Sequence, residues 1–393
     1  MVDQINTIQD KPRLYFIDMA RSIAILLMIE GHFTGSALSW EYRKYEFFAY
    51  KFWHILHGVT SPLFFTVTGI IFVYLLTARG QDVGYFQNPR VKKGFKRVLT
   101  LLFWGYLIQL NLGSIIKSIY YSVPIYLDWF YAFHVLQSIA IGLFILLVIY
   151  GLYKLIKIGP FYIYCLLTAI VIFILYSMLK THIEWDNKLI ANNLLDPNHR
   201  RYLPENAPSF LQNMFYGKFS DFNFLQYSGY TILGGMIGNL IRIYEKETKK
   251  WWFGASFIAV GIIFNFIVPM LYAEHLISRE VFISISTYIL RLGQVIGLIG
   301  ILMLIDANIK IRATLFLKLG QNTLPIYIVH VIILYGGIFG LGLKPLLFNE
   351  DLNPYFSMFI SLSAIIVFSV MVYFIEPLET MYNRVINKLF FWR

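Results

Sequence analysis

Residues 20–32 read ARSIAILLMIEGH, an apolar stretch whose second residue is Arg21 and which ends with Glu30 and His32. The run of apolar side chains around and within it suits a helix in the hydrocarbon layer of a bilayer. Ionisable side chains are costly in that layer, and those that occur there usually serve a function. The stretch therefore predicts a membrane helix that carries part of a functional site.

The composition of the whole chain agrees with this interpretation. Of 393 residues, 58% are hydrophobic and only 14% are charged, and the mean hydropathy is +0.62. Soluble domains carry about 25% charged residues, so the chain falls outside that class. Apolar runs long enough to cross a bilayer recur from end to end. The sequence predicts an all-α fold, a polytopic transmembrane helical bundle, which we expect in the bacterial inner (plasma) membrane.

We expect one transmembrane domain over residues 1–376, followed by an amphipathic tail over 377–393. In the tail, Met381, Val385 and Leu389 recur at helical spacing, which is typical of a helix lying in the membrane interface. The loop at 182–222 is the longest segment between spans. Ten spans are predicted, at 15–39, 52–78, 96–119, 127–151, 158–181, 223–244, 251–273, 281–305, 313–340 and 355–376.

The net charge of +11 is distributed along the chain as in a membrane protein. Basic residues gather in short connections on alternate sides of the spans, as in the run from Arg90 to Arg97. This pattern follows the positive-inside rule and places both termini in the cytoplasm, with the loop at 182–222 on the opposite side. No basic surface is left over for nucleic acid, so we expect membrane lipids as partners and no nucleic acid.

Helix geometry relates the two most unusual polar residues of the first span. Arg21 and His32 are eleven residues apart, which is close to three whole turns, so both side chains share one face about 16 Å apart. Glu30 projects from another face. A guanidinium at one end of this face can hold phosphate or polarise a carbonyl, and an imidazole at the other can act as a base near neutral pH. The pattern favours a reaction that runs through the membrane.

These residues resemble a known signature. The spacing R-x10-H in the first span is similar to that of the membrane acyltransferase-3 superfamily. The segment SPLFFTVTGIIF, residues 61–72, resembles that group's FF-x-x-S-G-F motif, with Thr68 in place of serine. WFYAFHVLQSIAIG, LQYSGYTILGGMIG and LGQNTLPIYIVH, at 129–142, 225–238 and 319–330, look like landmarks of its heparan-α-glucosaminide N-acetyltransferase-like branch. Lysosomal members of that branch carry asparagine at the position of His32, so His32 follows the broader superfamily.

The resemblance implies a function. An acyl group, usually acetyl, would pass from cytoplasmic acyl-CoA to a saccharide or lipid-linked glycan on the far side of the membrane. Arg21 and His32 carry over as the functional pair, and Arg21 with Arg97 would contact the donor. Acyl-CoA would be a donor substrate, with no cofactor bound permanently.

Four other intramembrane residues are candidates for contact with substrate. His57 lies at the outer end of the second span, and His330 lies in a ninth span that Pro325 interrupts. Freed backbone groups at such a break often line a cavity. Glu30 and Arg291 either form an ion pair with each other or contact substrate. No cluster with metal-ligand spacing accompanies the histidines, so we predict no metal site.

Two alternatives to an acyltransferase remain open from the sequence alone. The same charged cavity would suit a transporter or flippase of a lipid-linked sugar, although no inverted repeat is evident. A non-enzymatic membrane partner with a degenerate acyltransferase fold is the other. The sequence also leaves a homo-oligomer open.

Overall fold

The regular secondary structure of this protein is helical. The computed structural model describes residues 14–78, 83–124, 129–195, 203–204, 206–217, 220–309 and 314–390. The longer helices are α1 (Tyr15–Ala37), α2 (Phe48–Leu76), α3 (Pro89–Leu107), α4 (Leu112–Tyr120), α5 (Val135–Ile156), α6 (Phe161–Ala191), α7 (Ser209–Phe215), α8 (Phe224–Ile243), α9 (Trp251–Ala273), α10 (Arg279–Asn308), α11 (Leu315–Gln321), α12 (Thr323–Tyr335) and α13 (Pro354–Phe390). In these ranges the only extended pairing is an isolated bridge between Leu38 and Leu352. The predicted all-α class is confirmed.

Fewer helices than the ten predicted have the length and composition of a membrane span. Six helices of the described residues are long and apolar enough to cross a membrane, or up to eight if each of two bent pairs is one span. Two predicted spans, α1 and α8, are not among them. Both are largely buried inside the bundle, and their sequences include polar side chains and glycines beside the apolar ones. The count of ten stays a prediction.

Several predicted boundaries differ from the structure. The third span is two helices, α3 and α4, that meet at 46°. The predicted long loop begins as helix, because α6 continues to Ala191, where His182 and Asp186 lie one turn apart with Nε2 and Oδ2 3.6 Å from each other. Helix α13 runs on to Phe390, past the predicted end of its span at 376. Hydropathy locates apolar runs, but it does not report where a helix ends.

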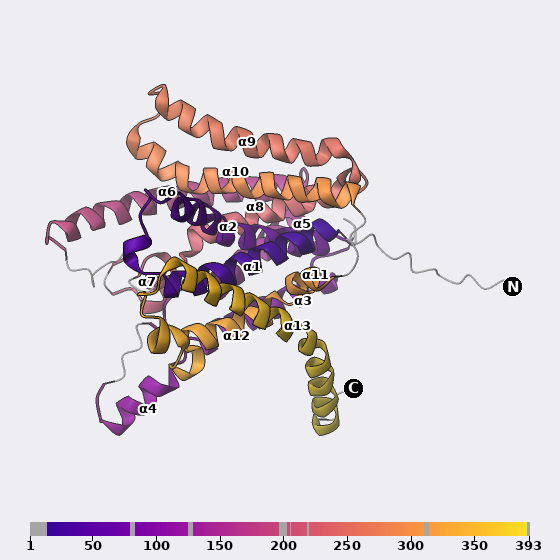
Figure 1. Ribbon diagram of the computed structural model, residues 1–393. Helices are drawn as coiled ribbons and strands as arrows, with labels where there is room; N and C mark the ends of the chain where they lie inside the picture. The colour runs from indigo at the N-terminus through magenta and orange to yellow at the C-terminus, as the bar shows by residue number, and fades with distance from the viewer. Residues whose placement is uncertain are drawn as a thin grey trace.

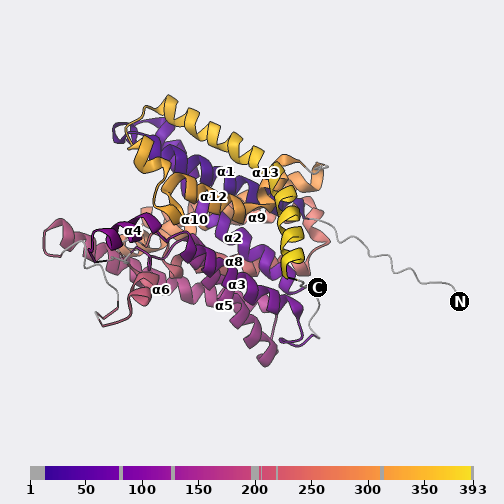
Figure 2. The ribbon, with the colours of Figure 1, turned by 90° about the horizontal axis from the view of Figure 1, so that it is seen from below.

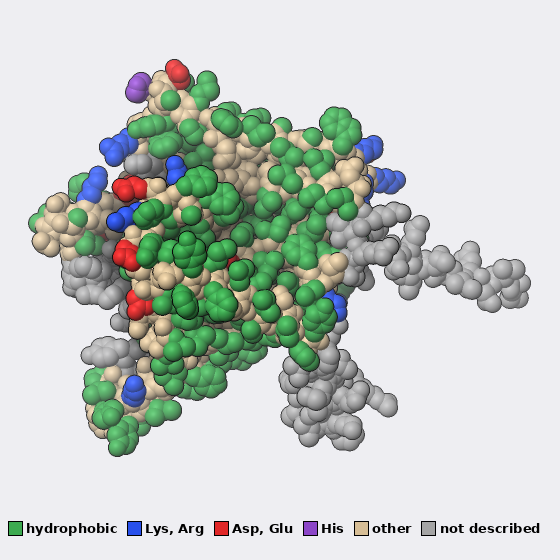
Figure 3. Space-filling view, in the orientation of Figure 1, with side chains coloured by type: hydrophobic (Ala, Val, Ile, Leu, Met, Phe, Trp, Pro, Cys, Tyr) green, Lys and Arg blue, Asp and Glu red, His purple; other side chains and the backbone are tan. Residues whose placement is uncertain are grey.

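The helices lie roughly side by side, with α1 in the interior. Helices α9 and α10 form one side of the bundle and α12 and α13 the other (Figure 1). Seen from below, α1 lies between α13 and the remaining helices (Figure 2), and its apolar side chains Ile25 and Ile29 are completely buried. On the face shown in Figure 3, charged side chains gather toward the ends of the helices and hydrophobic ones cover the band between. This pattern is that of a protein embedded in a bilayer.

The crossing of α2 and α8 depends on glycine. A Cβ at Gly69 would overlap the backbone oxygen of Thr231, and a Cβ at Gly234 would overlap that of Thr66. Small residues let two helix backbones approach this closely in membranes. Because α2 supplies one wall of the site described below, this contact positions that wall.

We therefore expect Gly69→Ala to lower the stability of the protein. The added methyl group meets backbone, which cannot rotate aside, and overpacking of this kind costs about 1–3 kcal/mol. Thermal unfolding in detergent measures the loss. Gly35→Ala is the matched control, because a Cβ at Gly35 has no atom within 4 Å, and its midpoint should stay that of the wild type. Equal midpoints for both variants would contradict the role of Gly69.

Candidate active site

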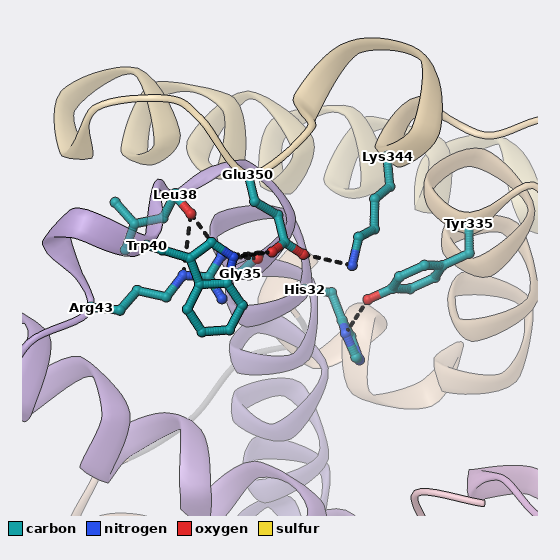
Figure 4. Close-up of polar contacts among 8 residues, drawn as sticks. All are labelled: His32, Gly35, Leu38, Trp40, Arg43, Tyr335, Lys344 and Glu350. Carbon is teal, nitrogen blue, oxygen red and sulfur yellow. Dashed lines mark hydrogen bonds and ion pairs between the residues drawn. The ribbon is translucent and has the colours of Figure 1, made fainter. Parts of the chain in front are cut away.

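His32 lies at the centre of a group of aromatic and imidazole rings from three helices. Its Nδ1 lies 2.8 Å from the hydroxyl of Tyr335 at the end of α12 (Figure 4). The ring of His330, also on α12, stacks on it with centroids 5.3 Å apart and planes 26° apart. The ring of His57, from α2, meets it edge-on at 6.3 Å. Three histidines far apart in the sequence thus share one site.

A hydrogen bond constrains the proton on one of these rings, that of His330. His330 Nδ1 lies 3.3 Å from the carbonyl oxygen of Ile326, which can only accept, so Nδ1 carries the proton of the neutral ring. His330 Nε2 then has a lone pair, and it is buried with no hydrogen-bond partner among the residues described. For His32, the tautomer with Nδ1–H donating to Tyr335 leaves the lone pair of Nε2 available to take a proton.

Arg21 lies three turns before His32 on α1 and lines a large cavity of its own. Its Nη2 donates to Oγ1 of Thr323 at 3.1 Å. The cavity beside it, which we call the basic cavity, has a volume of about 480 Å³. Its cationic lining residues are Arg21, Arg90, Lys93 and Arg97, and no carboxylate occurs among the described residues that line it. A space with four cations and no acid favours a polyanionic ligand.

The interruption before Pro325 supplies another wall of the basic cavity. Helices α11 and α12 meet at 81° at Asn322. Proline cannot donate a backbone hydrogen bond and its ring clashes with the carbonyl four residues earlier, so the helix restarts with Pro325 in its first turn. Residues 321–325 all line the basic cavity. The residues at the break therefore line a cavity, as expected from the sequence.

On the other side of His32 lies a second large space, the histidine cavity. Its volume is also about 480 Å³, and its polar lining includes His32, His134, His330, Asp221, Lys344 and Tyr335. Trp129 adds an aromatic surface. A saccharide is recognised by such a combination of hydrogen-bonding groups with an aromatic ring, because sugars present both hydroxyls and an apolar face.

A smaller space, the middle chamber, shares wall residues with both of these cavities. Its volume is about 80 Å³, and its walls include Met28, His32, His57, Phe64 and Tyr327. Phe64 also lines the basic cavity, His32 also lines the histidine cavity, and Tyr327 lines all three. The three cavities thus share walls along a line from Arg21 to His32, through the interior of the bundle.

Glu30 and Arg291 do not form the ion pair that the sequence left open. Glu30 accepts from Nε1 of Trp53 at 2.9 Å and from Oγ1 of Thr34 at 2.8 Å. Arg291 instead donates to the carbonyl oxygen of Ile55 at 2.9 Å. It reaches that backbone because Gly58 has no side chain, and a Cβ there would overlap the guanidinium.

Glu30 acts on the site through its neighbours. Trp53, which donates to Glu30, stacks on His57 with ring centroids 5.2 Å apart and planes within 5°. His57 in turn lies against Gly31, where any side chain would overlap its ring. Glu30 therefore positions Trp53 and, through it, His57, and neither Glu30 nor Arg291 is among the residues that line the three cavities.

A cluster of charges covers the end of α1 next to His32 (Figure 4). Arg43 donates to the carbonyl oxygens of Gly35 and Leu38, at 2.8 and 2.7 Å. Glu350 accepts from Trp40 Nε1 at 2.7 Å and pairs with Lys344 Nζ at 2.9 Å. The guanidinium satisfies carbonyls that a helix end leaves free. Lys344 extends from this cluster to the histidine cavity.

The cluster predicts a dependence of stability on pH. The hydrogen bond from Lys344 lowers the pKa of Glu350 below its ordinary value. A carboxylate with a lowered pKa in the folded state stabilises the fold at neutral pH and loses that contribution as pH falls through the folded pKa. We expect Glu350→Gln to lower the thermal midpoint at pH 7, with the difference from the wild type closing below about pH 4. A pH-independent effect of Glu350→Gln would contradict the cause.

Sequence reasoning missed Tyr335, Tyr327, Trp53 and Lys344. Tyr335 ends the helix of His330, and Tyr327 lies one turn before His330 in the segment PIYIVH. The periodicity of that helix was a signal that Tyr327 shares a face with His330. The contact of Tyr335 with His32 joins residues 303 positions apart, and no local pattern reports it.

One known family matches nearly the whole chain. The acyltransferase-3 family, described as an acyltransferase domain, matches residues 14–390, which is nearly the whole chain. No curated protein matches the chain. The match includes α1 with Arg21 and His32 and every helix that lines the three cavities. Its extent, together with the apolar helices, makes the protein a membrane acyltransferase, and the chain belongs to the acyltransferase-3 family.

Proposed function

We propose that the protein transfers an acyl group from cytoplasmic acyl-CoA to a saccharide or lipid-linked glycan on the opposite side of the membrane. The observation that supports this most is the row of three cavities with shared walls between Arg21 and His32. A donor and an acceptor that enter from opposite ends would meet beside His32. Bringing two reactants together in this way accounts for a large part of catalysis.

The donor end is assigned by charge. The phosphates of CoA are polyanionic, and the four cations of the basic cavity are their complement. Arg21 lies on α1, the helix of His32, and presents a planar guanidinium suited to phosphate or to the polar groups of the pantetheine arm. Basic residues also gather on the cytoplasmic side of membrane proteins. The basic cavity therefore opens to the cytoplasm in this proposal, and both termini lie on that side.

The acceptor end is assigned by shape and chemistry. The histidine cavity offers Trp129 for an apolar sugar face and Asp221, Lys344 and His134 for hydroxyl or amino groups. The resemblance to heparan-α-glucosaminide N-acetyltransferase-like proteins, which act on amino sugars, points to the same class of acceptor. An amine and a hydroxyl are both nucleophiles that need a base to remove their proton.

The transfer step follows from the groups that surround His32. The nitrogen or oxygen of the acceptor attacks the thioester carbon, and its proton passes to Nε2 of His32 while the carbonyl electrons move onto oxygen. When these electrons return, the C–S bond breaks. The thiolate of CoA leaves and takes the proton from His32, which regenerates the neutral ring. Tyr335 holds His32 Nδ1 throughout, and His330 stacks against the same ring.

Membranes of native cells that lack the protein test this function, because they contain the natural acceptor. Labelled acetyl-CoA is added to such membranes after complementation with wild-type protein or with His32→Ala. We expect label in non-CoA material with the wild type only. Uptake of a lipid-linked sugar without consumption of acetyl-CoA would favour a flippase, and equal labelling by both proteins would refute the role of His32.

A further inference from the structure

The middle chamber differs from its two neighbours in size. Its volume of about 80 Å³ is a sixth of that of either the basic cavity or the histidine cavity. A cavity of about 150 Å³ in a protein core holds a benzene molecule, which has six carbons, so each non-hydrogen atom needs roughly 25 Å³. The chamber therefore has room for about three such atoms. An acetyl group has three: two carbons and an oxygen.

The walls of the chamber match an acyl group in chemistry as well. Met28, Phe64, Phe65, Val135 and Phe222 give it an apolar lining. The same chamber is lined by Thr60 and His57, and both Oγ1 of Thr60 and Nδ1 of His57 are buried without a hydrogen-bond partner among the residues described. A buried polar atom without a partner is costly. A carbonyl oxygen beside a methyl group would satisfy both kinds of wall.

The location of the chamber decides which part of the donor reaches it. Phe64 and Tyr327 separate it from the basic cavity, where the phosphates are proposed to bind, and His32 forms its far wall. The thioester is at the end of the pantetheine arm. A donor that extends from the basic cavity toward His32 therefore places its acyl group, and no other part, in the chamber.

We propose that the middle chamber is the acyl pocket of the donor and that its volume limits the transferred group to two carbons. Met28 and Ser61, from α1 and α2, set this limit, because each lines the chamber and neither lines the basic cavity or the histidine cavity. This inference rests on the proposed function, since it takes acyl-CoA as the donor. A butyryl group, with two further carbons, would need about 125 Å³ by the same measure.

Binding of CoA esters to the purified protein in detergent tests the proposal without knowledge of the acceptor. Calorimetry compares the dissociation constants of CoA, acetyl-CoA and butyryl-CoA. For the wild type we expect butyryl-CoA to bind at least about tenfold more weakly than acetyl-CoA, since one surplus methylene alone changes discrimination by about 10- to 200-fold. Equal binding of the two esters overturns the acyl pocket. If none of the three binds, the donor in the proposed function is wrong instead.

Enlarging the chamber gives the first variant. Met28→Ala removes three non-hydrogen atoms from its wall, which adds roughly 75 Å³. We expect butyryl-CoA then to bind within threefold of acetyl-CoA. Met303→Ala is the matched control, because Met303 is also buried, at 1% exposure against 7% for Met28, but lines none of the three cavities. Met303→Ala should keep the wild-type preference, and a relaxed preference in both variants would overturn the assignment.

Filling the chamber gives the second variant, which does not depend on the stability of Met28→Ala. Ser61→Leu adds two non-hydrogen atoms, which fill roughly 50 Å³ by the same measure and leave too little of the chamber for the three atoms of an acetyl group. We expect it to weaken binding of acetyl-CoA at least tenfold and to leave binding of CoA, which has no acyl group, within threefold of the wild type. A parallel loss of both ligands would place Ser61 in the path of the pantetheine arm and overturn the acyl pocket.

Discussion

Replacing His32 with alanine should abolish acyl transfer while the protein still folds and binds its donor. A positioned general base contributes about 10²–10⁴-fold to the rate, and His32 lines both the middle chamber and the histidine cavity, where the two reactants are proposed to meet. The other two histidines surround this ring, His330 by stacking on it and His57 by an edge-on contact from α2. Single-turnover transfer of label from acetyl-CoA in complemented membranes measures the loss.

His54→Ala is the matched control for this prediction. His54 lies one turn before His57 on α2, where it contacts Tyr45 rather than any of the three cavities. Its loss should leave transfer within about threefold of the wild type. Binding of CoA by His32→Ala, measured by calorimetry, should match the wild type as well, because CoA carries no acyl group to contact the wall that His32 forms. Transfer by His32→Ala at the wild-type rate would remove the central residue of the proposed mechanism.

Helix periodicity explains why part of this site could be predicted from the sequence. Along α1 the backbone hydrogen bonds fix the angle between successive side chains, so Arg21 and His32 share a face whatever surrounds them. The structure adds what periodicity does not contain, namely that this face lines cavities at both ends. The interruption at Pro325 was predictable for a similar reason, because proline acts on the four residues before it.

Contacts between distant segments could not be predicted. Tyr335 reaches His32 because the 81° bend at Asn322 directs α12 across α1, and a bend angle is set by packing rather than by the proline itself. Glu30 and Arg291 show the same limit. Their opposite charges suggested a pair, yet Trp53 and the backbone of Ile55 lie closer to them. Charge indicates which residues need a partner, and packing decides which partner they find.

Two of the ten predicted spans, α1 and α8, do not have the length and composition of a membrane span, and both are buried by other helices. Lipid selects apolar side chains all around a helix, whereas α1 and α8 face protein on most sides and carry polar residues that hydropathy counts against a span. In α1 the same burial is what allows a helix to hold functional groups, since a cation facing acyl chains would be prohibitively costly. Helix α1 thus carries Arg21 and His32, whereas α8 lines none of the three cavities and supports the site through its contact with α2.

Replacing Arg21 with alanine should give the second large effect, on the donor. In the basic cavity Arg21 is the cation on α1, and its bond to Thr323 Oγ1 at 3.1 Å directs the guanidinium toward the start of α12. Hydrogen bonds to charged groups contribute about 1.5–3 kcal/mol each, which corresponds to a 10- to 150-fold change in affinity. We therefore expect acetyl-CoA to bind to Arg21→Ala more weakly than to the wild type by about that factor.

Two comparisons separate this effect from a general loss of charge. Arg21→Lys keeps the charge but not the planar fork, so it should recover only part of the affinity. Arg242→Ala removes an arginine that pairs with Glu245 and lines none of the three cavities, and it should bind acetyl-CoA as the wild type does. If Arg21→Ala also binds normally, the phosphates of the donor lie elsewhere. The basic cavity would then lose its assignment, because Arg21 is the cation that connects it to the helix of His32.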